Sequence, residues 1–150
     1  MNNSYALITG ASSGIGLEIA NNLANRGYNL VLTARREERL ASIAKEISEK
    51  FKVEVDFITC DLSNINAPTE IFNFCNDKAY KVEVLINNAG YGIKTPFHET
   101  PMQDEEDFIR VLGTSVIALT KIFLPSMIEN QKGKIMIVSS VASFSPPSSI

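Results

Sequence analysis

Short apolar runs alternate with amphipathic segments along most of the chain. The run at 29–33 is of the buried parallel-strand type, and strands are also predicted at 5–8, 82–86 and 135–138. A further strand is predicted where Val53, Val55 and Phe57 alternate with polar residues, ending at Cys60-Asp61-Leu62. The pattern therefore predicts five strands.

Between these runs, apolar residues recur at helical spacing. The predicted helical faces carry Ile15, Ile19 and Leu23 with Ala20 and Ala24; Leu40, Ile43, Ala44 and Ile47; and Ile71, Phe72 and Cys75. Arg26-Gly27 closes the first of these helices with a C-terminal signal. A long helix is predicted from near Asp104, after an irregular segment at 90–101 that is the expected mobile part. Residues 143–150 are predicted to be a Ser/Pro loop.

Regular alternation of strands and helices predicts an α/β fold in a single domain spanning residues 1–150. Right-handed βαβ crossovers give a doubly wound parallel sheet with helices on both faces. We predict the strand order 3-2-1-4-5. Ligands of such sheets bind beyond the carboxyl ends of the strands at the switch point, which here lies between strands 1 and 4.

The stretch Thr9-Gly10-Ala11-Ser12-Ser13-Gly14-Ile15-Gly16 follows the first strand and opens the first helix. Glycines there permit positive φ and let a diphosphate approach the main chain, and a helix N-terminus favours an anion. The spacing is neither G-x-G-x-x-G nor that of a nucleoside triphosphatase loop, and no lysine follows. The pattern predicts a nucleotide site, with close packing of strand and helix as the alternative.

Three motifs taken together resemble the short-chain dehydrogenase/reductase family: Thr9-Gly10-x-x-x-Gly14-x-Gly16, Asn87-Asn88-Ala89-Gly90 and Ser139-Ser140. The resemblance spans essentially the whole chain and implies a Rossmann-type fold. In that family further strands follow the fifth, so we expect this sequence to be an N-terminal portion, truncated before the later strands. The strand 135–138 would then be a sheet edge.

The resemblance implies a set of cofactor-binding residues: Gly10, Ser12, Ser13, Gly14, Ile15, Gly16, Arg35, Asp61, Leu62, Asn88, Ala89 and Gly90. In the family pattern Asp61 bonds the adenine amino group and Leu62 follows the base. Asn87 braces neighbouring strands, while Asn88, Ala89 and Gly90 line the cofactor. The alternative for Asp61 is a turn aspartate, because Ser63-Asn64 continue as turn residues.

Arg35 stands near the place where an NAD-specific dinucleotide fold carries an acidic residue, and position 34 is alanine. A guanidinium accepts a 2′-phosphate through paired, charge-assisted hydrogen bonds. The resemblance therefore implies NADP(H), with NAD less favoured. Arg36 fits a solvated helix start better.

For catalysis the resemblance implies hydride transfer to or from a small carbonyl or alcohol substrate, with Ser140 bonding the substrate oxygen. The family's acid/base tyrosine belongs to a Tyr-x-x-x-Lys motif expected about a dozen residues beyond Ser140, and no such motif occurs in these 150 residues. Leu112 falls near the place of a family asparagine that supports a proton-relay water; Thr114 and Ser115 are the nearest polar residues. A non-catalytic NADP(H)-binding or sensing module is the alternative, and a methyltransferase a weaker one.

Composition and charge limit the kinds of partner and the location that we expect for this protein. A net charge of −3 and a pI near 5.2 predict no nucleic-acid partner. No apolar run approaches the ~20 residues of a membrane span, so we expect no membrane insertion and a cytoplasmic protein. Cys60 and Cys75 are predicted to be buried, reduced thiols.

No metal site is predicted. The acidic run at 104–107 complements a helix dipole, and His98, the single histidine, is expected on the surface. The apolar breadth of the helix at 108–127 fits the family's habit of pairing subunits there, so a homo-oligomer is expected.

Overall fold

The computed structural model describes residues 4–140. Its elements, in chain order, are β1 (Ser4–Thr9), α1 (Gly14–Asn25), β2 (Asn29–Ala34), α2 (Glu37–Phe51), β3 (Val55–Thr59), α3 (Ala67–Asp77), β4 (Lys81–Asn87), the 3-10 turn η1 (Phe97–Glu99), α4 (Met102–Ile109), the π-helical turn η2 (Arg110–Thr114), α5 (Ser115–Glu129) and β5 (Lys134–Ile137). The predicted loop at 143–150 lies outside the described residues.

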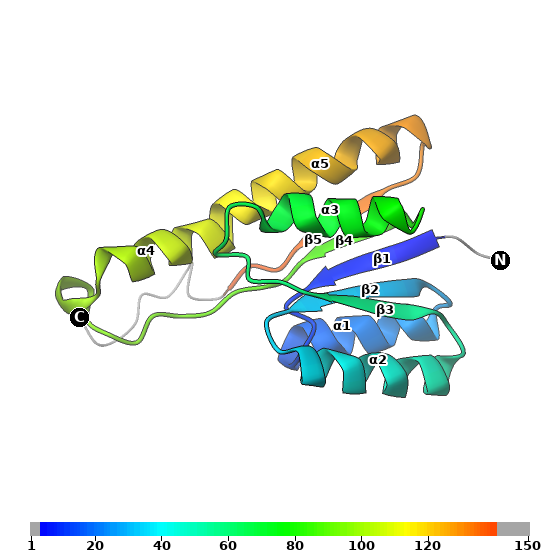
Figure 1. Cartoon of the computed structure of the whole chain (residues 1–150), viewed down its shortest axis with the longest axis horizontal. Helices are drawn as coiled ribbons and strands as arrows, with labels where there is room; N and C mark the ends of the chain where they lie inside the picture. Colours follow the sequence, from blue (N-terminus) through cyan, green and yellow to red (C-terminus); the bar gives the residue numbers. More distant parts are fainter. Residues whose placement is uncertain (1–3, 141–150) are drawn as a thin grey trace.

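The five strands form one parallel sheet in the order β3-β2-β1-β4-β5 (Figure 1). The predicted fold class and strand order are therefore confirmed. Strand boundaries differ from the predicted ones by one or two residues. β1 pairs with β2 on one side and β4 on the other, so the switch point lies between β1 and β4.

Helices cover both faces of the sheet: α1 and α2 lie below it in Figure 1, and α3 and α5 above it. Alternate residues of each strand face the two helical layers. Ala6 and Ile8 of β1 lie in the core with α1 and α2, whereas Tyr5 and Leu7 lie in the core with α3 and α5. Both faces of β1 are buried, as is typical of a parallel strand with a continuous apolar run.

The packing of α1 differs from the prediction at Ile15, whose side chain is 62% exposed. The buried stripe is made of the small residues Gly16, Ala20 and Ala24. The two alanines are core residues facing β1 and β2. Small side chains let this helix approach the sheet closely, and that leaves the larger Ile15 on the outside.

The predicted long helix begins at Met102, and a π-helical turn joins α4 to α5. By length and composition alone, the continuous helix Met102–Glu129 is apolar enough to cross a membrane, and it is the single such helix among the described residues. One of its faces packs into the core through Leu119, Phe123 and Met127. Ile117 and Ile128 on its other face are 62% and 66% exposed.

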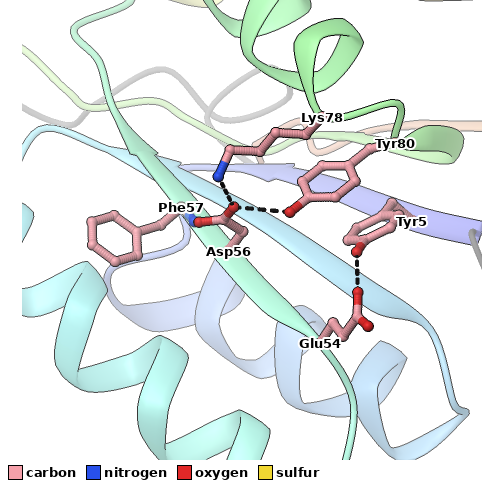
Figure 2. A network of polar contacts seen from close by, with 6 residues as sticks. All are labelled: Tyr5, Glu54, Asp56, Phe57, Lys78 and Tyr80. Atoms are coloured by element: carbon pink, nitrogen blue, oxygen red, sulfur yellow. Dashed lines mark hydrogen bonds and ion pairs between the residues drawn. The ribbon is translucent and has the colours of Figure 1, made fainter.

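The two edges of the sheet differ in chemistry. At the β3 edge, Asp56 accepts hydrogen bonds from Tyr80 (3.0 Å) and from the Lys78 ammonium (2.6 Å), as Figure 2 shows. Tyr80 stacks on Tyr5, whose hydroxyl donates to Glu54 next to β3. Charged side chains therefore lie at this edge. Charges on an edge strand commonly disfavour pairing with a further strand.

The β5 edge has no such network within the part of the chain that the structure describes. Ile135, Met136 and Ile137 are 37%, 49% and 58% exposed, and β5 pairs with β4 alone. The prediction that this strand ends the sheet therefore holds for the described residues.

Replacing Asp56 with asparagine tests how much the Asp56 charge contributes to stability at the β3 edge. Burial raises the pKa of Asp56, but hydrogen bonds from Lys78, the Phe57 main chain and Tyr80 outweigh that effect and lower it. A depressed carboxyl pKa stabilises the fold above the unfolded pKa, and this contribution is lost as the pH falls through the folded value. Asp56→Asn is expected to lower the free energy of unfolding at pH 7 by about 1 kcal/mol.

The measurement is urea denaturation followed by circular dichroism at pH 7 and at stepwise lower pH. The difference between wild type and variant should shrink below about pH 4. Asp77→Asn is the control, because Asp77 makes no ion pair in residues 4–140. A loss that stays constant with pH would contradict a role for the Asp56 charge.

Candidate functional site

The glycine turn after β1 adopts the backbone conformations that its sequence requires. Gly10 and Gly14 have φ of +67° and +57°. A Cβ on Gly10 would lie 2.8 Å from Ala89 Cα, so the turn touches the end of β4 directly. Around Gly14 nothing lies within 4 Å of the same position, and its main chain borders open space. Ser13 precedes α1 without capping it through its side chain, and an uncapped helix N-terminus is a favourable place for an anion.

Thr9 and Asn88 lock this turn to β4. The Thr9 hydroxyl accepts hydrogen bonds from the main-chain amides of Asn88 and Ala89, both at 3.0 Å, and donates to Ile86 O at 3.3 Å. The Asn88 side-chain amide donates to Thr9 O at 3.0 Å and Gly10 O at 3.3 Å. A Cβ on Gly16 would lie 2.4 Å from both Asn88 Nδ2 and Gly10 O. Gly16 is therefore required for packing.

The structure distinguishes Asn87 from Asn88 by their contacts. The bracing expected of Asn87 is carried out by Asn88, which does not line the cleft described below. The Asn87 side chain is 3% exposed, and neither its oxygen nor its nitrogen has a hydrogen-bond partner. A buried amide without partners costs about 1–3 kcal/mol for each group and is a natural position for an internal water.

A cleft of about 410 Å³ opens above the carboxyl ends of the strands. It lies where β1, β2, β3 and β4 end, with α4 and η2 contributing one wall. Its lining is Gly10, Ser12, Ser13, Thr33, Ala34, Arg35, Arg36, Cys60, Asp61, Leu62, Ser63, Ala89, Gly90, Tyr91, Asp107 and Val111.

The predicted residues divide into two groups. Those that line the cleft are Gly10, Ser12, Ser13, Arg35, Asp61, Leu62, Ala89 and Gly90, and those outside its lining are Gly14, Ile15, Gly16, Asn88 and Ser140. Ser140 is exposed and follows the end of β5 by three residues. Its catalytic role stays a prediction.

Arg36 is exposed at the start of α2, as expected for a solvated helix start, but it also belongs to the site. Its guanidinium donates to the Ser12 hydroxyl at 3.2 Å, and it lines the cleft beside Arg35. The β2-to-α2 turn folds back over the glycine turn and brings two adjacent guanidinium groups to one rim. Single-sequence reasoning missed this because a basic residue at a helix start has no distinctive pattern.

Asp61 and Leu62 follow β3 on the same side of the cleft. Asp61 Oδ1 accepts a hydrogen bond from the Ser63 amide at 3.0 Å, so Asp61 also forms the turn that was its alternative interpretation. Leu62 is 7% exposed and belongs to the core that Val111 shares. The cleft floor is thus continuous with the core between the sheet and α3.

The cysteines are buried and free, as the sequence indicated. Burial and the neighbouring Glu70 raise the pKa of Cys60 to about 11, and burial raises that of Cys75 to about 12. Cys60 lines the cleft as a neutral thiol and is a poor nucleophile at pH 7.

The wall formed by Tyr91, Asp107 and Val111 was not predicted as part of the site. Only the family motif immediately before Tyr91 pointed to its neighbourhood. Burial, together with Asp107 and Asp104, raises the pKa of Tyr91. This is opposite to the shift that a phenol acting as a base at neutral pH requires.

Leu112 lies within η2, next to Gly90, a residue that lines the cleft. A Cβ on Gly90 would approach Leu112 Cδ2 to 2.8 Å. Nearby, the Ser115 hydroxyl donates to Val111 O at 2.8 Å, so it is engaged with its own helix. Ser115 is a packing residue, one of the two interpretations that the sequence left open.

The other titratable residues considered from the sequence, His98 and the acidic run at 104–107, form no metal centre in residues 4–140. No group of three or more His, Cys, Asp or Glu side chains there is arranged to hold a metal ion. The His98 side chain is 80% exposed and lies 3.5 Å from Glu99. Asp104 and Glu105 lie in the first turn of α4, where carboxylates complement the helix dipole.

Comparisons with a family model, with relatives and with solved structures all point to the same family. The family model described as short chain dehydrogenase matches residues 4–150. A very-long-chain 3-oxoacyl-CoA reductase of Pyrenophora tritici-repentis is 35% identical over 147 residues, which are 95% of this chain and 43% of the reductase.

Two solved structures illustrate the fold match. A metagenomic short-chain oxidoreductase in complex with NADP is 33% identical with a TM-score of 0.89, covering 98% of this chain and 66% of that one. L-sorbose reductase of Gluconobacter frateurii, complexed with NADPH and L-sorbose, is 29% identical with a TM-score of 0.90, covering 96% and 55%. The chain thus spans less than half of the curated reductase and about 55–66% of these two structures.

Two glycine substitutions separate packing from backbone strain in the turn. Gly16→Ala is expected to destabilise the fold by about 1–3 kcal/mol through overpacking against Asn88. Gly14→Ala meets no neighbour and is expected to cost about 1–2 kcal/mol through its positive φ. The distinguishing measurement is amide hydrogen exchange at Asn88 and Ala89. Exchange should accelerate in Gly16→Ala and not in Gly14→Ala; equal acceleration in both would refute the packing role of Gly16.

Proposed function

Because this chain belongs to the short-chain dehydrogenase family, we propose that it is the NADP(H)-binding portion of an oxidoreductase acting on a carbonyl or alcohol group. The single observation that carries the proposal is the cleft at the switch point. It combines a glycine turn, an uncapped helix N-terminus and two guanidinium groups. A dinucleotide with an additional phosphate matches this combination of anion sites.

The main chain and side chains of the turn are proposed to hold the pyrophosphate. Open space surrounds the position of a Cβ on Gly14, and the amides of a helix N-terminus favour an anion. Gly10 and Gly16 serve a different purpose in this proposal, since the bracing by Asn88 depends on them. Ser12 and Ser13 line the cleft and add hydroxyl donors.

The preference for NADP(H) over NAD(H) is proposed to come from Arg35 and Arg36. Residue 34 is alanine, so no carboxylate stands at the end of β2 to bind both ribose hydroxyls. Arg36 is held in place by Ser12, which reduces the freedom it would lose when it binds a phosphate. Solved relatives complexed with NADP and NADPH support this choice.

The bound cofactor would supply hydride transfer at the nicotinamide carbon. Ser140 is proposed to bond the oxygen of the substrate, as the family resemblance implies. The substrate is proposed to be a small molecule; the sorbose reductase and the 3-oxoacyl-CoA reductase show two such classes among relatives. Tyr-x-x-x-Lys does not occur in the 150 residues, so no acid/base pair is assigned.

A second candidate, a non-catalytic NADP(H)-binding module, is favoured by Leu112. An aliphatic side chain packs over Gly90 near the place where the family resemblance puts a polar relay residue. Absorbance at 340 nm separates the two proposals. The enzyme consumes NADPH with at least one ketone of a panel, whereas the module binds NADPH without consuming it.

Assembly and location complete the proposal. The exposed apolar face of α5 supports a homo-oligomer, since Ile117 and Ile128 together make a surface of the kind that subunits cover. Free, buried cysteines support a reducing, cytoplasmic location.

Arg35→Ala and Arg36→Ala test the cofactor preference. Loss of a charge-assisted hydrogen bond to phosphate costs about 1.5–3 kcal/mol, so each variant is expected to bind NADPH about 10–100 times more weakly. NADH has no 2′-phosphate and serves as the control ligand; its Kd should change less than about threefold. Both values come from isothermal titration calorimetry. Unchanged NADPH affinity in both variants would remove the 2′-phosphate assignment.

A further inference from the structure

Tyr91 is the large aromatic side chain that lines the cleft. It follows Gly90 at the end of the β4 segment, and 42% of its surface is exposed. Its hydroxyl makes no hydrogen bond that the structure records. An aromatic ring that is open to a polar cleft offers a face on which a flat ligand can stack.

The ring of Tyr91 is held in position by α4. Phe108 packs edge-on against it, with ring centroids 5.5 Å apart and an interplanar angle of 81°. This edge-to-face arrangement is one of the favoured geometries for aromatic pairs. The side chain therefore presents a supported ring to the space above Gly90.

Apolar side chains on the other elements border the same space. Leu62 comes from the end of β3, and Val111 from η2, and the two share one core cluster. Tyr91 lies close enough to Asp61, the residue before Leu62, for the Asp61 carboxylate to act on its phenol, so the segments that follow β3 and β4 approach each other at the cleft. A flat heterocycle entering from the polar rim would have Leu62 on one side and the Tyr91 ring on the other.

We propose that Tyr91 is the adenine-stacking residue of this cleft, so that the base lies between Leu62 and the Tyr91 ring. The assignment rests on the proposed function and adds a residue that the family motifs do not contain. Arg35 and Arg36 hold the phosphate at the rim, while Tyr91 and Leu62 hold the base behind it. Tyr91 is thus a positioning residue for the adenosine half of the cofactor.

The electrostatic surroundings agree with a stacking role. Burial, Asp107 and Asp104 keep the phenol protonated at neutral pH. Asp107 and Asp61 both line the cleft, so an additional phenolate would be repelled. The neutral ring offers its face to a base, and base–aromatic stacking contributes about 1–3 kcal/mol by alanine substitution.

The test uses 2′,5′-ADP, which contains the adenine and the 2′-phosphate but no nicotinamide. Tyr91→Ala is expected to weaken its binding about 5- to 150-fold, and Tyr91→Phe less than about twofold, because the ring and not the hydroxyl contacts the base. Phe97→Ala is the matched control: Phe97 is an 83% exposed aromatic on the same segment and does not line the cleft. Affinities are measured by isothermal titration calorimetry.

A second ligand locates the effect within the cofactor. Reduced nicotinamide mononucleotide lacks adenine, and its affinity should be the same in Tyr91→Ala and wild type. Unchanged 2′,5′-ADP binding in Tyr91→Ala, or a loss confined to the mononucleotide, would overturn the adenine assignment while leaving the proposed function intact. A wild-type chain that binds neither NADPH nor 2′,5′-ADP contradicts the proposed function and this assignment with it.

Discussion

The hydrogen bonds between Thr9 and Asn88 are the constraint on which the cleft depends. They join the end of β1 to the end of β4, two strands that are neighbours in space and distant in sequence. The Thr9 hydroxyl has both of its functions occupied, since it accepts from two amides and donates to one carbonyl. Gly10 and Gly16 lack side chains because the Asn88 amide occupies the space that a Cβ would need. This network therefore closes the gap between the ends of β1 and β4, and the cleft opens beyond the carboxyl ends of the strands.

Around this fixed base, the charged groups are distributed by strand order. Arg35 and Arg36 follow β2, Asp61 follows β3, and Asp107 reaches the cleft from α4. The cleft is therefore basic on one rim and acidic on another, although the whole chain carries a net charge of −3. Such local separation of charge orients a ligand that carries both phosphate and hydroxyl groups, which an evenly charged pocket would not.

Most of the fold follows from the sequence, because buried parallel strands and amphipathic helices have distinct periodicities. The strand order required topology rules and the family resemblance in addition. Ile15 was placed on the wrong face, since helical spacing alone does not reveal that a helix lies too close to the sheet for a large side chain. The bracing role was predicted for Asn87 and is carried out by Asn88, because neighbouring asparagines look alike until their partners across the sheet are known.

The lining of the cleft could be predicted where a motif or a strand end marks it, and not where distant contacts form it. Gly10, Arg35 and Asp61 lie at strand ends and line the cleft. Tyr91 and Asp107 reach it only through the path of the segment after β4 and the placement of α4. Arg36 entered the site through its bond to Ser12, 24 positions away, which no local pattern encodes.

The two edges of the sheet differ in how readily each could pair with a further strand. At β3, Asp56 accepts hydrogen bonds from Lys78 and Tyr80 and also from the Phe57 amide of its own strand. At β5, the side chains Ile135, Met136 and Ile137 are apolar and partly exposed, and within residues 4–140 the strand pairs only with β4. A strand added beside β5 would place the cleft, which lies at the β1–β4 switch point, nearer the middle of the widened sheet.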